Sequence, residues 1–219
     1  MRHSRTATLG IWAVAAAAAT LRVLAPAGAA EVGGQSRAVA RFDRISTNGA
    51  FTVHVTAGSA RQSLTVSGDP STVARVTTTV ADGTLSLGMT SGTNFLTHLP
   101  VIDIEVPVLR GYDNAGAGSA TIEGLTGGNL TISNAGAATI RAAGHAGRLS
   151  VELDGVGTIE ASQLYAGDVS VENNGVGRVD VRAAGTLTIA VNGVGEVRYA
   201  GNPTHVESHV NGIGRIVRL

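Results

Sequence analysis

The 219-residue sequence has no cysteine and no lysine, and aromatic residues make up only 3% of it. The lack of cysteine excludes a disulfide framework, a thiol nucleophile and a cysteine-ligated metal site. With so few rings, the interior must be built from small and β-branched aliphatic side chains. Net charge is zero, and beyond the first 30 residues 13 arginines face 16 acidic residues. This slightly acidic balance argues against a nucleic-acid partner.

The N-terminus has the pattern of a secretory signal. Arg2 and Arg5 precede an apolar run from Leu9 to Leu21, and small residues follow up to Glu31. The run is shorter than the ~20 residues that a membrane-spanning helix needs. We therefore predict a signal peptide over residues 1–30, export to the periplasm or the medium, and no transmembrane segment in the mature chain. An uncleaved membrane anchor is the alternative.

Residues 31–40 have the composition of a flexible lead-in, and from Phe42 onward apolar residues alternate with polar ones, as in strands. The turn signals Asn48-Gly49 and Asp82-Gly83 separate the runs. A β-rich N-terminal part over residues 41–111 is predicted. Its expected strands cover residues 50–57, 63–67, 73–80, 84–89 and 101–108, and the segment 73–80 is also compatible with a helical turn.

The second half repeats a glycine-rich corner such as Asn-Gly-Val-Gly. The first glycine of each corner recurs in steps of 20, 19, 20, 18 and 19 residues, at Gly116, Gly136, Gly155, Gly175, Gly193 and Gly212. A period near 19 is too short for a βαβ unit. It predicts an all-β fold, a parallel β-helix or solenoid over residues 112–219, in which each rung bonds to its neighbours. Glycine at the corner lets the backbone bend and lets successive rungs approach each other.

Two apolar columns keep phase with the corner glycine, and we expect both to face inward. One follows the glycine directly, at Ala117, Ala137, Val156, Val176, Val194 and Ile213. The other lies four residues after it, at Ala120, Ile140, Ile159, Val179, Val197 and Ile216. A short apolar strand precedes each corner from the second onward, for example at Leu130 and Ile132.

A polar column precedes the glycines, at Asp154, Asn174, Asn192 and Asn211. Stacked amides in successive rungs can bond to one another and tolerate tight turns, so we interpret this column as a structural ladder. A calcium site is the alternative, although one carboxylate supplies few of the oxygens that a hard cation needs. No metal and no cofactor are expected.

His205, Glu207 and His209 lie on one face of the last predicted strand. Two histidines and a carboxylate are possible metal ligands. The alternative, which we prefer, is that these side chains protect the exposed final edge of the solenoid together with Arg215 and Arg218.

Several segments resemble the head GIN domain family of autotransporter adhesins from about residue 40 to the end. They are FDRI at 42–45, LTVSGD at 64–69, GTLSL at 83–87, VRYAGNP at 197–203 and NGIG at 211–214. The resemblance implies a bacterial, exported, β-helical domain with a role in adhesion or surface structure. Because the repeats run to Leu219, we expect no translocator to follow and residence in the periplasm or release.

No catalytic motif stands out. Asp103 and Glu105 alternate along one predicted strand toward solvent, and the one tryptophan, Trp12, lies in the predicted signal peptide. We therefore expect a non-catalytic structural or adhesion-type domain that binds an envelope protein or a surface polymer. A carbohydrate-active β-helix enzyme is the alternative, and homo-oligomerisation is left open.

Overall fold

The computed structural model describes residues 34–90 and 98–219. The predicted signal peptide, residues 1–30, lies outside them. These described residues form one compact unit, and their strands belong to a single 17-stranded sheet. The helix in the described part, α1 (Pro70–Val73), has four residues, and no helix in that part is long and apolar enough to cross a membrane.

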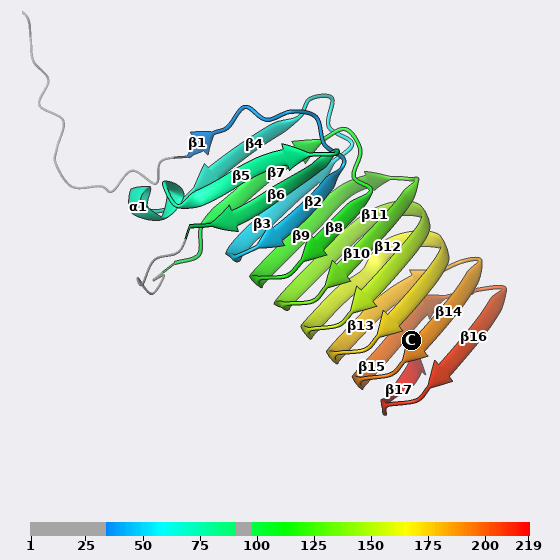
Figure 1. Ribbon diagram of the computed structural model, residues 1–219. Coiled ribbons are helices and arrows are strands. Elements are labelled where there is room, and N and C mark those ends of the chain that lie inside the picture. Colours follow the sequence, from blue (N-terminus) through cyan, green and yellow to red (C-terminus); the bar gives the residue numbers. More distant parts are fainter. Residues whose placement is uncertain (1–33, 91–97) are drawn as a thin grey trace, which may run out of the picture. The chain divides into compact units, whose positions relative to one another are not determined.

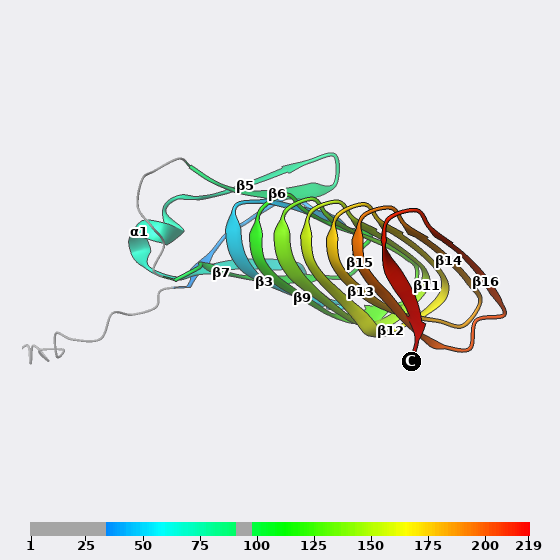
Figure 2. The ribbon, with the colours of Figure 1, turned by 90° about the horizontal axis from the view of Figure 1, so that it is seen from below.

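The repeat region is a stacked series of parallel strands, which confirms the predicted β-solenoid (Figures 1 and 2). Strands of successive rungs pair in parallel with the offsets of the sequence repeat: Thr131 lies beside Gly111, Leu149 beside Leu130, and Leu187 beside Val169. The strands are β8 (Gly111–Asn114), β9 (Ala117–Thr126), β10 (Asn129–Asn134), β11 (Ala137–Leu153), β12 (Val156–Asn173), β13 (Val176–Ala183), β14 (Thr186–Val191), β15 (Val194–Gly201), β16 (His205–Val210) and β17 (Ile213–Arg218).

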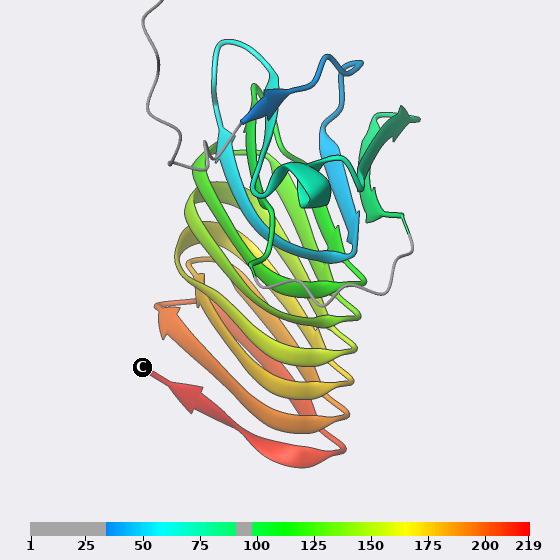
Figure 3. The ribbon, with the colours of Figure 1, turned by 90° about the vertical axis from the view of Figure 1, so that its left-hand side faces the viewer.

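The N-terminal strands extend this ladder out of sequence order. The rung formed by β2 (Arg44–Asn48) and β3 (Ala50–Ala57) pairs in parallel with β8 and β9 on one side. On its other side it pairs in parallel with β6 (Thr84–Met89) and β7 (Val101–Val106). Beyond these, β5 (Val76–Ala81) pairs antiparallel with β6, and β4 (Ser63–Ser67) pairs antiparallel with β7. The ladder is therefore no longer parallel at this end (Figure 3).

The sequence predicts a flexible lead-in over residues 31–40, and its described part is instead anchored. Strand β1 (Gln35–Ser36) pairs antiparallel with β4. The guanidinium of Arg37 donates hydrogen bonds to the carbonyl oxygens of Val73 and Val76, at 2.9 and 2.5 Å. Backbone pairing and the hydrogen bonds of Arg37 hold this segment against the first rungs. The composition of a short polar segment does not reveal such contacts.

The ambiguous segment 73–80 divides between two elements. Helix α1 begins at Pro70, whose fixed φ suits the first helical turn, and β5 begins at Val76. The predicted turn at Asp82-Gly83 joins β5 to β6 as a two-residue hairpin, with φ of 49° and 74° at its two residues. Positive φ at both positions is the signature of the type I′ turn that favours this dipeptide.

One of the two predicted inward columns is buried, and the other is not. Ile140, Ile159, Val179 and Val197 are 0% exposed, as predicted. The column that directly follows the corner glycine faces solvent, so its prediction was wrong. The two columns are three residues apart, an odd number, and alternate residues of a strand point to opposite faces. Only one of them can therefore face the interior.

The corner glycines are required because successive rungs touch there. A Cβ atom on Gly175 would lie 2.0 Å from the carbonyl oxygen of Gly155, and the other five predicted corner glycines have equivalent contacts at 1.9–2.0 Å. None of these six glycines is among the residues with positive φ. Close backbone approach, rather than a left-handed conformation, excludes every other side chain at this position.

We predict that Gly175→Ala lowers the free energy of unfolding by about 3 kcal/mol or more, because the added methyl collides with backbone that cannot move independently. Gly147→Ala is the matched control, since its Cβ would have its nearest neighbour, the Gly128 carbonyl oxygen, at 3.3 Å. Urea unfolding followed by circular dichroism measures both. Equal stability of the two variants would show that the rungs separate readily at the corner.

Candidate functional site

The polar corner column forms a directed hydrogen-bonded ladder. The amide nitrogen of Asn174 donates to Asp154 Oδ1 at 2.9 Å, that of Asn192 to Asn174 Oδ1 at 2.8 Å, and that of Asn211 to Asn192 Oδ1 at 3.2 Å. Each rung thus donates to the rung before it. The ladder ends on a carboxylate, which accepts without needing to donate.

Three of these oxygens are poorly placed to serve as a cation site, because Asp154 Oδ1, Asn174 Oδ1 and Asn192 Oδ1 each already accept an amide hydrogen. Among the described residues, no group of three histidine, aspartate or glutamate side chains is arranged to hold a metal ion. His205, Glu207 and His209 all lie exposed on β16 and do not form such a group. We propose that the corner column acts as scaffold.

If the column is scaffold, changing Asn174, Asn192 and Asn211 together to Ala should lower the melting temperature by several degrees. Each lost bond contributes about 0.5–1.5 kcal/mol. Scanning calorimetry should give the same decrease in EDTA and in millimolar calcium. A wild-type melting temperature that rises with calcium, and a triple variant that does not respond, would instead identify an ion site.

A second, buried asparagine column was missed in the sequence. The Thr47 hydroxyl donates to Asn114 Oδ1 at 2.8 Å, and the Asn114 amide donates to Asn134 Oδ1 at 2.7 Å. Further along the same column, Asn173 is 0% exposed and lies between Leu153 and Val191. Its two amide atoms have no hydrogen-bond partner among the described residues. The signal was an asparagine two residues before the corner glycine in three of the repeats.

Replacing Asn173 by Val should raise the free energy of unfolding by about 1–3 kcal/mol, because it removes a buried amide that makes no hydrogen bond. Asn134→Val should have the opposite effect, since it removes the buried oxygen to which the Asn114 amide donates at 2.7 Å and leaves that amide only its 3.3 Å bond to the Gly116 carbonyl oxygen. Thermal unfolding of both variants checks the difference in sign. Destabilisation by both would indicate that a buried water satisfies Asn173.

The column that was expected inside forms an exposed apolar stripe. Its large members lie side by side in successive rungs, and their exposed fractions are 57%, 49%, 45% and 76% for Val156, Val176, Val194 and Ile213. We call these four residues the apolar stripe. A shallow groove of about 610 Å³ runs beside its C-terminal part, lined among others by Arg178, Val194 and Glu196. Contiguous exposed aliphatic side chains are typical of binding surfaces.

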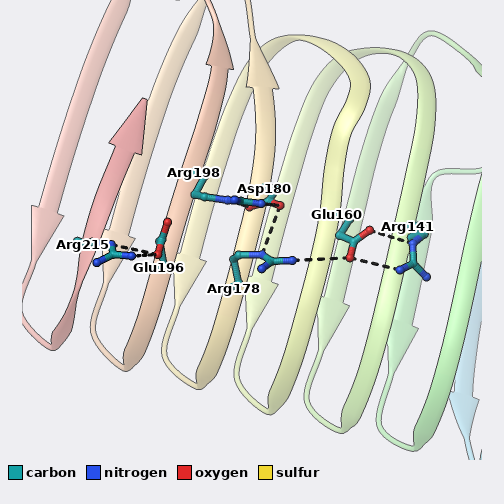
Figure 4. Close-up of polar contacts among 7 residues, drawn as sticks. All are labelled: Arg141, Glu160, Arg178, Asp180, Glu196, Arg198 and Arg215. Atoms are coloured by element: carbon teal, nitrogen blue, oxygen red, sulfur yellow. Dashed lines mark hydrogen bonds and ion pairs between the residues drawn. The ribbon is translucent and has the colours of Figure 1, made fainter. Parts of the chain in front are cut away.

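A network of charges lies on the strands that carry the stripe and on the neighbouring strand β11; Figure 4 shows its members. It links neighbouring rungs: Arg141 Nε lies 2.9 Å from Glu160 Oε2, and Arg215 Nη2 lies 2.7 Å from Glu196 Oε2. We call this network the charged ladder; its members are Arg141, Glu160, Arg178, Asp180, Glu196, Arg198 and Arg215. The sequence signal was a pair of opposite charges one repeat apart, as in Glu196 and Arg215.

The charged ladder contains one deeply buried carboxylate. The Asp180 side chain is 6% exposed and is bound by both nitrogens of the Arg198 fork, with Nε donating to Oδ1 at 2.7 Å. Arg178 Nε lies 3.4 Å from its other oxygen. The hydrogen bond to Asp180 raises the pKa of Arg198 above its ordinary value. This fork geometry fixes the orientation of both side chains.

The described clefts are small or open. The cleft that borders the charged ladder, lined by Thr121, Glu123, Arg141, Glu160 and Gln163 among others, has a volume of about 170 Å³. Pockets for small ligands usually enclose ~300–1,000 Å³. Glu160 in this cleft is engaged by Arg141 and, at 3.8 Å, by Arg178. The arrangement supplies no pair of free carboxylates for acid–base chemistry.

A small aromatic cluster lies on the return side of the rungs. The rings of His145 and Tyr165 stack with centroids 5.6 Å apart, and the Arg182 guanidinium lies 4.9 Å from the Tyr165 centroid. His145 and Arg182 come from the rungs on either side of Tyr165. His145 and Arg182 therefore flank the tyrosine ring, which remains 55% exposed.

Comparison with known proteins gives one family and several solved structures. Residues 41–203 match the model of the family described as "Putative auto-transporter adhesin, head GIN domain". No curated protein matches the sequence. A crystal structure described as a putative adhesin from Bacteroides fragilis is similar, with a TM-score of 0.70 and 26% sequence identity. The alignment covers 85% of this chain and 96% of that one.

Two structures from Parabacteroides distasonis align over similar lengths. One is described as a putative adhesin, with a TM-score of 0.44 and 16% identity, and the other as a putative lipid binding protein, with 0.41 and 17%. Each alignment covers 85% of this chain and 96% of the other chain.

Proposed function

This chain belongs to the head GIN domain family of auto-transporter adhesins, and on that premise we propose that it is a non-catalytic, exported domain that binds an envelope or surface component. The observation that carries the proposal is the apolar stripe, a row of aliphatic side chains exposed on the outside of a rigid sheet. Export rests on the signal peptide predicted over residues 1–30, with the mature chain resident in the periplasm or released.

The stripe suits an extended partner better than a small molecule. Each rung contributes one aliphatic side chain at the same place, so the contact repeats at the spacing of neighbouring strands, ~4.8 Å. The stripe lies on paired strands whose corners are packed backbone to backbone, so binding orders little additional chain. Preorganisation of this kind lowers the entropic cost of association.

The charged ladder supports binding rather than catalysis. Its three carboxylates, Glu160, Asp180 and Glu196, are each bound by an arginine of a neighbouring rung. A carbohydrate-active enzyme needs two carboxyl groups, one as acid and one as base or nucleophile, at a set separation across the sugar. Carboxylates that are saturated by arginine serve instead to hold the rungs in register and to give the stripe a polar margin.

The stripe variant Val176→Asp with Val194→Asp should remain folded and lose binding. Exposed positions tolerate charge with changes of about 0.5 kcal/mol or less, whereas Val179→Asp, which buries an unpaired charge in the core, should unfold the protein. Binding is measured by cosedimentation with whole cells and isolated envelope of the producing organism. Release of reducing sugar from envelope polysaccharide is assayed in parallel.

The matched control carries the same charge on the strands that precede the corner, as Ser170→Asp with Thr188→Asp, which also lie side by side in adjacent rungs. It should bind as wild type does. Equal loss of binding in both variants would show that charge alone, and not the stripe, is responsible. Sugar release by the wild type would overturn the non-catalytic assignment.

A further inference from the structure

Among the described residues, the last rung of the solenoid has an unpaired edge. Within residues 34–90 and 98–219, β16 pairs with β14 alone and β17 with β15 alone, so one edge of each strand has no partner. Apolar side chains are exposed there: Val206 is 41%, Val210 45%, Ile213 76% and Leu219 61% exposed. Figures 1 and 2 show this rung at the end of the stack. Terminal repeats of solenoids normally carry a polar cap.

The opposite end of the coil does not offer a matching edge. There the parallel ladder stops at β6 and β7, which are covered by the antiparallel strands β5 and β4, and β1 is added to β4 (Figure 3). A second molecule stacked head to tail would meet antiparallel strands rather than a solenoid rung. Two last rungs related by a two-fold axis can instead meet edge to edge, which closes the assembly at two copies.

Strand β16 is self-complementary in one antiparallel register. Val206, Ser208 and Val210 continue the inward column of Leu187, Ile189 and Val191, so Glu207 and His209 face outward. With Ser208 on the two-fold axis, Val206 of one copy lies opposite Val210 of the other. In the same register Glu207 lies opposite His209, a pair that carries opposite charge when the imidazole is protonated. Such cross-strand pairs stabilise sheets.

Strand β17 fits the same axis. Ser208 precedes the corner Gly212 by four residues and Ile216 follows it by four, which places them at the same level on the two sides of the rung. With Ile216 on the axis, the exposed Ile213 lies opposite Leu219, and Arg215 lies opposite Val217. The register therefore places no like charges opposite each other.

We propose that the last rung is a homodimer interface in which β16 and β17 each pair antiparallel with the same strand of a second copy. The two neighbouring registers that keep the inward face are unfavourable. Centring β16 on Glu207 places two glutamates opposite each other, and centring β17 on Arg215 does the same for two arginines. The polar residues that protect this edge against general association thus disfavour the registers on either side of the proposed one.

A cysteine at the axis tests the register directly. The chain has no cysteine, so Ser208→Cys supplies a single thiol that can form a disulfide only between molecules. At the axis the two thiols face each other across antiparallel strands, at a separation that a disulfide spans. The control is Ser170→Cys, which is exposed on the same sheet two rungs earlier. The purified protein is oxidised at micromolar concentration and resolved on non-reducing gels.

We expect Ser208→Cys to crosslink at least tenfold faster than Ser170→Cys, and sedimentation equilibrium of the wild type to give twice the 22.0 kDa chain mass, less the mass of any cleaved signal peptide. Equal crosslinking rates, or a monomer at all concentrations up to ~100 μM, would overturn the proposal. A dimer whose Ser208→Cys variant does not crosslink would place the interface elsewhere and would also overturn it.

Charge exchange separates the interface from folding. His209→Glu places two carboxylates opposite each other across the interface and should weaken dimerisation at least tenfold. Adding Glu207→Arg to that variant restores opposite charges in the proposed register and should recover the dimer. Circular dichroism confirms that both variants are folded. Failure of the double variant to recover the dimer while it remains folded would contradict the pairing of Glu207 with His209.

Discussion

Close contact between backbones at the corners is the constraint on which the rest of this structure depends. With 1.9–2.0 Å between a corner carbonyl oxygen and the position that a Cβ would take in the next rung, only glycine fits there. The contact fixes the register of each rung against the last, and a one-residue slip would turn every side chain to the other face. The polar corner column, the apolar stripe and the charged ladder all depend on this register, since each is formed by equivalent residues of successive rungs that lie side by side.

The repeat allowed the architecture to be predicted, because a period of 18–20 residues is also the register offset of the paired strands. It did not indicate the order of the N-terminal strands. The rung of β2 and β3 is inserted between strands that come later in the chain, β6 and β7 on one side and β8 and β9 on the other. Such pairings depend on long-range packing, and the local alternation of apolar residues is the same wherever a strand lies in the sheet.

The candidate site was predicted in part. The polar corner column was located from its spacing, and the structure adds its hydrogen bonds. The valines next to the glycine were assigned to the core because they are apolar and regular, and those properties are shared by a core column and a binding stripe. The interval of three residues between the two apolar columns is odd, so only one of them can face the core and the other must lie outside. The charged ladder was detectable by comparing residues one rung apart, since Asp180 and Arg198 differ by one repeat.

The interior shows what this construction costs. A polar residue inside a coil of identical corners is hydrogen-bonded where a neighbouring rung supplies its partner, as Asn134 does for Asn114. Asn173 lies between aliphatic neighbours and lacks such a partner among the described residues. A single apolar rung, here that of Leu153, interrupts the chain of hydrogen bonds, so one column can hold both bonded and unbonded amides.

The sides and the end of the solenoid would act together in the proposed dimer. A two-fold axis that passes through Ser208 and Ile216 crosses the strands on both sides of the rung, so it keeps the outer faces of the two copies on the same side. It also reverses the strands, which places the two apolar stripes at opposite edges of one continuous face. A partner surface that displays repeated sites could then engage both stripes at once. The second contact would be intramolecular, and avidity would exceed the affinity of either stripe without any new contact. Binding through weak, shallow contacts, such as the groove beside Val194, gains most from this arrangement.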